Sequence, residues 1–309
     1  MTHSHAQNDD PYNVEISVNT DNDALVAWKN KDIYYTYGIG AQVAFQAEHL
    51  LALERLFPSK TSHFFKTGLR MEGYTPSNKF IYAAELVNVD EVFDRPFAGL
   101  LYGTMEASYI FENSTLTTGM LFGILGPSSR AGDLQIWFHE SVTDDALIDG
   151  WEFQLPDQLL LNFNMAYTYD FTPKSKIISA YGGGEVHFGN LYVKAVPSLG
   201  VRIGKFAPLT RSVAVDNSIL LKRNETELFF LAKYDLAVNL FNATAQGKLF
   251  GPNNNLALST INTVDSLLTL GIYFTYYRWT VNFNHYFSFG KVIPKTNHVY
   301  ARIGLFHRF

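Results

Sequence analysis

The sequence predicts an all-β protein: a transmembrane, antiparallel, up-and-down β-barrel of about twelve strands, with a short helix in an extracellular loop. Long segments alternate between apolar and polar residues, which is the period of a strand with two different faces. The 309 residues are 47% hydrophobic and only 17% charged, and they include 25 Phe and 18 Tyr. No apolar run reaches the roughly 18 residues that a membrane helix needs. Contact with lipid would therefore require strands, which span a membrane only as a closed barrel.

Alternation of period two marks twelve segments. They are residues 14–21, 34–46, 64–74, 97–111, 114–125, 158–171, 175–187, 190–204, 226–242, 263–277, 279–289 and 298–309. Most match the roughly 9–11 residues of a tilted membrane strand. A soluble β-sandwich or β-barrel is the alternative, but soluble strands this long and aromatic would risk pairing edge to edge. We expect one barrel domain over residues 1–309, in which residues 1–12 are an N-terminal tail or signal remnant.

The last predicted strand shows the alternation best. One set of its residues would face lipid: Ala301, Ile303, Leu305 and Phe309. The other set would face the lumen: Arg302, Gly304, Phe306 and Arg308. A C-terminal aromatic residue on such a strand resembles the signal that the bacterial barrel-assembly machinery recognises. We therefore expect that machinery to be a partner during biogenesis.

An even number of strands puts both termini at the periplasmic end, where such barrels have short turns, and leaves the longer loops outside. The predicted outer loops are residues 22–33, 75–96, 126–157, 243–262 and 290–297. Two inner connections, residues 47–63 and 205–225, are longer than expected. The first contains EHLLALERLF, which is typical of a short amphipathic helix. The second has no clear pattern.

Composition limits the kinds of site and partner that the protein could have. The chain has no cysteine, which excludes disulfides and thiolate metal sites and fits a protein exported to the bacterial outer membrane. Its net charge of −5 argues against nucleic acid as a partner. The first ten residues lack the basic and apolar regions of a signal peptide, although Ser4-His5-Ala6 is compatible with the remnant of a cleavage site. We expect a monomer.

Five segments with unusual residues fall at the predicted extracellular rim, on neighbouring strands. They contain Asp21-Asn22-Asp23, Thr36, Lys79, Asp94-Arg95-Pro96, and Gly126-Pro127 leading to Gln135 and His139. The segments are far apart in the sequence, and the strands were assigned without reference to them. Their convergence predicts a site at this rim.

Residues 133–142 are expected to form a short helix over the rim or dipping into the lumen. Asp133 could cap its N-terminus, and Gln135 and His139, four apart, would share a face. His139 could act as a general base, and an ordinary solvent-exposed loop histidine is the alternative. Ser141 lies two residues further on and would face away, so water is the expected nucleophile.

Two further features fit a catalytic site. Asp21-Asn22-Asp23 supplies the hard oxygen ligands that suit calcium or magnesium, although the EF-hand pattern is absent and a simple turn is the alternative. Lys79 could bind a phosphate or stabilise an oxyanion, unless it is a lysine that faces water. There is no Gly-x-Ser-x-Gly elbow and no His-Glu-x-x-His motif, so an α/β-hydrolase and a zincin are excluded.

Taken together, these segments resemble the LpxR family of lipid A 3′-O-deacylases over roughly the first half of the chain. The resemblance rests on the order and spacing of these pieces: Asn22-Asp23-Ala-Leu, Tyr35-Thr36-x-Gly38, Tyr74-Thr-Pro76 with Lys79, Asp94-Arg-Pro-Phe-Ala-Gly99, Gly126-Pro127-Ser128, Gln135-x-x-x-His139 and Gly150-Trp151-x-x-Gln154. Tyr37 stands where relatives often carry Asn. Thr20-Asp21 is a second possible register for the Asn-Asp pair, and it would lose the Asn.

The resemblance implies a calcium-dependent hydrolase that removes the 3′-linked acyloxyacyl chain of lipid A, within lipopolysaccharide, by ester hydrolysis. It implies that His139 activates water, that Asn22 and Asp23 hold calcium or orient the site, and that Lys79 meets the oxyanion or a lipid A phosphate. Thr36 and Gln135 would support them by hydrogen bonds. Two alternatives use the same fold. One is a catalytically inactive surface or structural barrel. The other is a narrow transport channel. Trp137, Phe138 and Trp151 could help plug the lumen, which argues against a channel.

Overall fold

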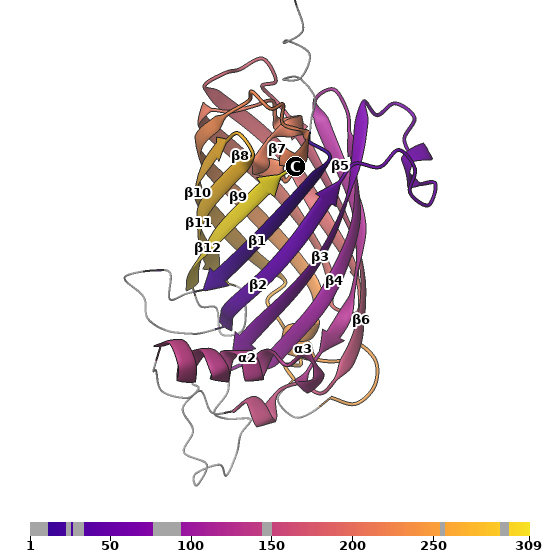
Figure 1. Ribbon diagram of the computed structural model, residues 1–309. Coiled ribbons are helices and arrows are strands. Elements are labelled where there is room, and N and C mark those ends of the chain that lie inside the picture. Colours follow the sequence, from indigo (N-terminus) through magenta and orange to yellow (C-terminus); the bar gives the residue numbers. More distant parts are fainter. Residues whose placement is uncertain are drawn as a thin grey trace, which may run out of the picture.

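The computed structural model describes residues 12–22, 26, 34–76, 94–143, 150–253, 257–290 and 297–309. These residues form one closed barrel of twelve antiparallel strands, each paired with its neighbours in the chain, with β1 paired to β12 (Figure 1). The strands are β1 (Val14–Asn22), β2 (Tyr34–Phe45), β3 (Ser62–Thr75), β4 (Ala98–Ile110), β5 (Ser114–Leu125), β6 (Gln158–Asp170), β7 (Ile178–Gly189), β8 (Tyr192–Lys205), β9 (Glu227–Asn242), β10 (Val264–Tyr276), β11 (Trp279–Phe289) and β12 (Asn297–Arg308). All twelve predicted strands are confirmed. None of the described helices is long and apolar enough to cross a membrane.

The two faces of the wall follow the predicted alternation. On β12, Ile303 and Leu305 are exposed on the outside, whereas Arg302 lines the lumen and Arg308 is buried. Because strand side chains alternate between the two faces, one apolar set meets lipid and the other surrounds a polar lumen. The lumen encloses a cavity of about 710 Å³ lined mainly by charged, amide and tyrosine side chains.

The two ends of the barrel differ in the length of their connections, and this difference indicates how the barrel is oriented in the membrane. At one end, short turns join β4 to β5 and β10 to β11, and the amide of Phe309 donates to the carbonyl of Val14 at 2.8 Å. The other end carries the longer connections, including the helices α2 (Ala131–Phe138) and α3 (Ala243–Gln246) (Figure 1). Short turns mark the periplasmic end, so α2 and α3 are extracellular.

The connection between β8 and β9 closes the periplasmic mouth of the lumen. Residues 206–226, here named the plug, contain the short 3-10 turns Leu209–Arg211, Val213–Val215 and Ser218–Leu220. The Glu227 carboxylate accepts from Ser212 Oγ at 2.7 Å, Asn217 donates to Thr115 Oγ1 on β5 at 3.0 Å, and Ser218 donates to Glu15 on β1 at 2.7 Å. The plug is therefore bonded to strands β1, β5 and β9, which are evenly spaced around the wall (Figure 1).

The connection between β2 and β3 is not the amphipathic helix that its sequence predicts. Its helical part is a single 3-10 turn, Leu53–Arg55. Leu51 and Ala52, which precede that turn, have φ angles of 52° and 62°. An α-helix cannot continue through left-handed residues, so the apolar spacing in EHLLALERLF does not produce one.

Candidate active site

A bulge in β2 moves Thr36 to the outer face of the wall. Pairing with β3 shifts register between Tyr35 and Tyr37, so one residue is inserted there. The Tyr35 hydroxyl points into the lumen and donates to Asp21 at 2.6 Å. The Thr36 hydroxyl instead lies 2.8 Å from the hydroxyl of Thr75, which follows the lumen-facing Tyr74 and so points outward. Bulges commonly re-aim a side chain near an active site.

Two glycines make a flat floor beside Thr36, on the same outer face. Gly73 on β3 is paired with Gly99 on β4. The ring of Tyr37 covers Gly73 so closely that a Cβ there would lie 2.3 Å from its Cε1. A Cβ on Gly99 would lie 2.5 Å from Ser129 Oγ and 2.8 Å from the Cβ of Ala131, the first residue of α2. Helix α2 therefore starts in direct contact with the outside of the barrel wall.

Tyr37 fixes α2 to this floor. Its hydroxyl donates to the carbonyl of Ala131 at 2.6 Å, and the side chain is almost fully buried. Thr36 and Thr75 are also buried, although nearby outward residues such as Ile39 and Leu69 are more than half exposed. The wall is thus open to lipid over most of its height and covered only at its extracellular end. The candidate site lies at this boundary.

Gln135 is held inside the contact between α2 and the wall. Its Oε1 accepts from the indole Nε1 of Trp151 at 3.0 Å, and the Trp151 ring packs against Gly132 one turn earlier on α2. Its Nε2 is buried and has no hydrogen-bond partner among the residues that the structure describes. A buried amide donor without a partner is costly to keep, and such donors are common where a ligand is bound.

His139 stands at the point where α2 changes its helical geometry. The helix ends at Phe138 and continues as a π-helical turn, His139–Thr143. The amide of His139 donates to the carbonyls of Gln135 and Ile136, so His139 and Gln135 are one turn apart, as the sequence predicts. The imidazole is half-buried. Single π-turns inside helices are frequent at functional sites.

The side chains of Asn22 and Asp21 lie on opposite faces of the barrel wall. The two residues are consecutive in β1, so their side chains point to opposite faces. Asp21 faces the lumen. Asn22 shares the outer face with Tyr37, its partner in β2, and so lies on the side of Thr36 and α2. The structure therefore does not bring Asp21 and Asn22 together as one group.

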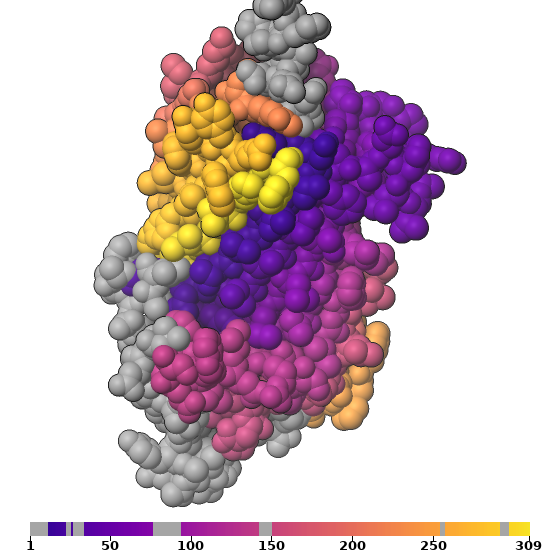
Figure 2. Space-filling view, viewed as in Figure 1, coloured from indigo at the N-terminus to yellow at the C-terminus, as the bar shows by residue number. Residues whose placement is uncertain are grey.

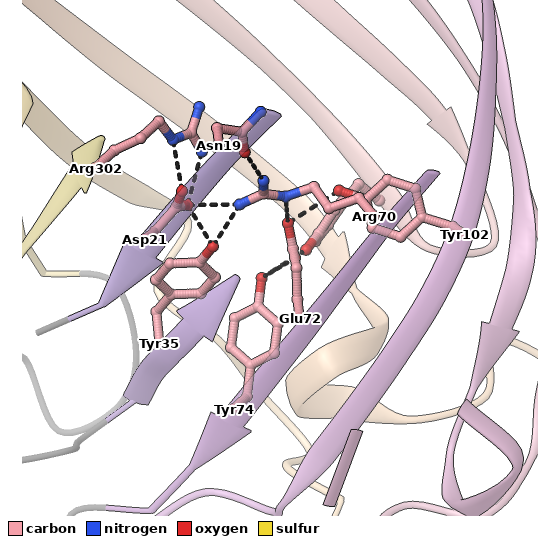
Figure 3. Close-up of polar contacts among 9 residues, drawn as sticks. Asn19, Asp21, Tyr35, Arg70, Glu72, Tyr74, Tyr102 and Arg302 are labelled. Atoms are coloured by element: carbon pink, nitrogen blue, oxygen red, sulfur yellow. Dashed lines mark hydrogen bonds and ion pairs between the residues drawn. The ribbon is translucent and has the colours of Figure 1, made fainter. Parts of the chain in front are cut away.

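Asp21 instead belongs to an ion-pair cluster inside the barrel (Figure 3). Its carboxylate accepts two hydrogen bonds from Arg302, both at 2.7 Å, and one from Arg70 at 2.5 Å. Arg70 also donates to Glu72 at 2.6 Å and to Asn19 at 2.5 Å. Two guanidinium groups already satisfy this fully buried carboxylate, which leaves it unsuited to a divalent cation.

Two predicted site residues, Asp23 and Lys79, lie outside the described residues. In the part of the chain that is described, no three carboxylate or imidazole groups gather where they could hold a metal. On the outer face of the wall at this end, the described side-chain oxygens include those of Asn22, Thr36 and Thr75. These neutral oxygens do not by themselves fit a calcium site, which needs carboxylates.

The aromatic residues of this loop do not plug the lumen. Trp137 is 55% exposed and Phe138 is 38% exposed on α2, outside the wall, and Trp151 is buried beside Gly132. The interpretation that these side chains obstruct the barrel is therefore wrong. Instead, α2 presents large apolar groups at the level of the extracellular rim, where amphipathic aromatic side chains favour the membrane interface.

The fold agrees with the comparisons to known proteins. The model of the family described as outer membrane protein LpxR matches residues 1–309. The chain belongs to the LpxR family. The solved structure of LpxR from Salmonella typhimurium is 15% identical, covers 96% of this chain and 100% of its own, and superposes with a TM-score of 0.74. This likeness shows a shared barrel fold. The search of curated proteins found no match.

Autotransporter barrels are less similar to this LpxR-family chain. The β domain of BrkA from Bordetella is 9% identical and covers 97% of this chain and 100% of its own, with a TM-score of 0.48. The translocator domain of NalP from Neisseria meningitidis is also 9% identical, covers 96% of this chain and 88% of its own, and has a TM-score of 0.41. As a member of its family, the protein is an outer-membrane β-barrel of the bacterial cell envelope.

Three residues of this candidate site were not singled out as functional by sequence reasoning. Tyr37 and Trp151 hold α2 and Gln135 in place, and Gly99 gives α2 room to approach the wall. The sequence offered only weak evidence for the first two. Tyr37 follows the predicted site residue Thr36, and Trp151 belongs to a motif shared with the family. A glycine in a strand often marks a close approach, and the pairing of Gly73 with Gly99 becomes visible only once the register is known.

We expect Gly99→Ala to displace α2 and lower any activity of this site. The added methyl would meet Ser129, in the 3-10 turn Pro127–Ser129, and Ala131, in the first turn of α2. Gly103→Ala is the matched control, because Gly103 lies on the same face of β4 and the nearest atoms to its methyl would belong to the exposed, rotatable ring of Phe122. Limited proteolysis of the loop and the rate of lipid A conversion measure the effect. Equal behaviour of the two variants would contradict the close contact.

Proposed function

We propose that this LpxR-family barrel is a lipid A deacylase, which removes the 3′-linked acyloxyacyl chain by ester hydrolysis with a water activated by His139. One observation supports the proposal: α2 lies against the outside of the wall at its extracellular end, with Gln135 buried at that contact and His139 one turn further along the helix. Lipid A occupies the outer leaflet, and its acyl esters lie just below the headgroups. A site in this position could reach such an ester without extracting the lipid from the membrane.

In this proposal each residue has a role that matches its chemistry. The His139 imidazole takes a proton from water, the water oxygen attacks the ester carbonyl, and the proton then passes to the leaving alkoxide. The Nε2 donor of Gln135 is aimed at the developing oxyanion or a substrate oxygen, while Thr36 supports the site from the wall. Lys79 is proposed to meet the oxyanion or a lipid A phosphate.

Calcium is part of the proposal through Asn22 and Asp23, which would supply oxygen ligands. When bound, the ion would polarise the ester carbonyl. Asp21 is left out, because its carboxylate already pairs with Arg70 and Arg302. Recognition by the barrel-assembly machinery and the monomeric state stay predictions.

Mass spectrometry of lipid A tests the function. The purified protein is incubated with lipid A in detergent, with calcium or with EGTA. The expected result is loss of the mass of one acyloxyacyl group with calcium and intact lipid A with EGTA. Cleavage in both conditions would retain the deacylase and remove calcium from the proposal. Intact lipid A in both would contradict the deacylase.

The plug argues against the channel alternative. It is bonded to three strands around the periplasmic mouth and packs Leu209 and Val213 against Phe229 inside the barrel. We expect the protein to give no steady current in planar bilayers, and a variant with residues 208–224 replaced by a short Gly-Ser linker to conduct ions. Sustained conductance of the unmodified protein would show that the mouth is open.

A further inference from the structure

The connection between β2 and β3 stands out from the side of the barrel at its periplasmic end (Figures 1 and 2). This segment, residues 46–61, is named the periplasmic lobe. It is folded on itself, because the Lys60 ammonium donates to the carbonyls of Glu54 and Leu56, and the Glu54 carboxylate accepts from the Leu50 amide at 3.2 Å. It is therefore a built element with a defined inner and outer side.

The inner side of the lobe covers part of the outer wall. The Tyr109 hydroxyl on β4 donates to the carbonyl of Leu53 at 3.1 Å, and the ring of Phe57 lies 5.0 Å from the ring of Tyr109. Tyr109 and Phe65 are fully buried as a result. Elsewhere at the periplasmic end, aromatic side chains such as Trp279 are about half exposed and form the girdle that meets the membrane interface. The lobe thus replaces lipid over one section of that girdle.

The outer side of the lobe presents apolar residues again. Leu51 is 86% exposed and Leu56 is 46% exposed. Leu51 has a φ angle of 52°, which is unfavourable for a side chain of this size, and its side chain lies where water would otherwise surround it. A strained backbone that exposes apolar side chains implies a contact that compensates for both costs.

We propose that the periplasmic lobe is a membrane anchor, which inserts Leu51 and Leu56 among the phospholipids of the periplasmic leaflet. The lobe packs on the outward-facing Phe65 and Tyr109 of β3 and β4, at the end of the barrel where Trp279 is half exposed, so its outer side lies beside the lipid-facing wall, which favours lipid as the occupant. The charged residues of the lobe are Glu48, Glu54, Arg55 and Lys60, so its net charge is zero with His49 neutral. Binding therefore rests on apolar insertion at the interface and not on attraction to anionic lipid.

Single-cysteine labelling tests the anchor, because the chain has no cysteine of its own. Leu51→Cys and Leu56→Cys are labelled with an environment-sensitive fluorophore, and the protein is reconstituted in phosphatidylethanolamine–phosphatidylglycerol vesicles. Trp279→Cys is the control for the lipid girdle, and Lys174→Cys, an exposed residue of the β6–β7 turn, is the control for periplasmic water. Emission is quenched either by spin-labelled lipid or by aqueous iodide. A heat-modifiable shift on gels confirms that each variant is folded.

The expected result is that the labels at residues 51 and 56 lose emission to spin-labelled lipid to the same degree as the label at residue 279, with blue-shifted spectra. The label at residue 174 should respond only to iodide. Quenching of both lobe labels by iodide alone would overturn the anchor. Protection from both quenchers would also overturn it, because it would indicate a protein partner or a second copy of the chain.

Discussion

Replacing His139 with Ala is expected to lower the rate of lipid A deacylation by about 10²–10⁴-fold, the usual contribution of a positioned general base. The half-buried imidazole begins the π-helical turn at the end of α2, so its removal should leave the contact of Ala131 with the wall intact. Mass spectrometry of lipid A over time measures the rate, and the heat-modifiable shift on gels reports the fold.

His187→Ala is the matched control for this prediction. His187 lies on β7, lines the lumen and is 3.3 Å from Glu185, far from α2 in the barrel order. It should keep the activity of the unmodified protein. Full activity of the His139→Ala variant would remove His139 from the mechanism, and loss of the folded form in that variant would assign it a structural role.

Replacing Asp21 with Ala is expected to lower the free energy of unfolding by about 3 kcal/mol, because two arginines would be left inside the barrel without their shared carboxylate. Arg70 would retain Glu72, so the cost is placed at the lower end of the range for a broken buried pair. Urea unfolding in detergent, followed by tryptophan fluorescence, measures this change. Glu112→Ala, in the exposed β4–β5 turn, should change the stability little.

The same variant separates a structural role of Asp21 from a role in binding calcium. If Asp21 belongs to the lumen cluster, the calcium concentration that gives half-maximal activity should be unchanged in the protein that remains folded. A shift in that concentration with unchanged stability would instead return Asp21 to the metal site.

The strands could be predicted from the sequence because lipid and a polar lumen impose opposite demands on alternate residues. Each of the twelve strands carries this alternation, and no strand depends on a distant residue for its pattern. The orientation followed from the even number of strands and the unequal loops. In such a barrel, the alternation of apolar and polar residues is enough to predict most of the fold.

The same alternation, applied to single residues, would have separated Asp21 from Asn22. Three adjacent polar residues suggested one ligand group, but consecutive residues of a strand point to opposite faces. Thr36 is harder, because its outward position depends on the bulge between Tyr35 and Tyr37, and no local pattern marks that bulge. The side of the wall on which α2 lies depends on Gly73 and Gly99, which are distant in the sequence.

The two long inner connections were difficult for a different reason. Neither is stabilised by its own periodicity. The plug is held by side chains of strands β1, β5 and β9, and the periplasmic lobe rests on Tyr109 of β4. Their conformations are set by tertiary contacts, which a local pattern does not contain.

The plug also bears on how the barrel closes. The seam between β1 and β12 joins Glu15 to Arg308, close to the two ends of the chain, so its formation carries the largest loop-closure entropy of any strand pair. Ser218 of the plug binds the Glu15 carboxylate, which Arg308 also contacts at 2.9 Å, and Phe306 packs with plug residues. The plug, although it is distant in sequence from the N-terminal strand, thus contacts both strands of the seam. These contacts stabilise the closed seam in addition to the pairing of β1 with β12.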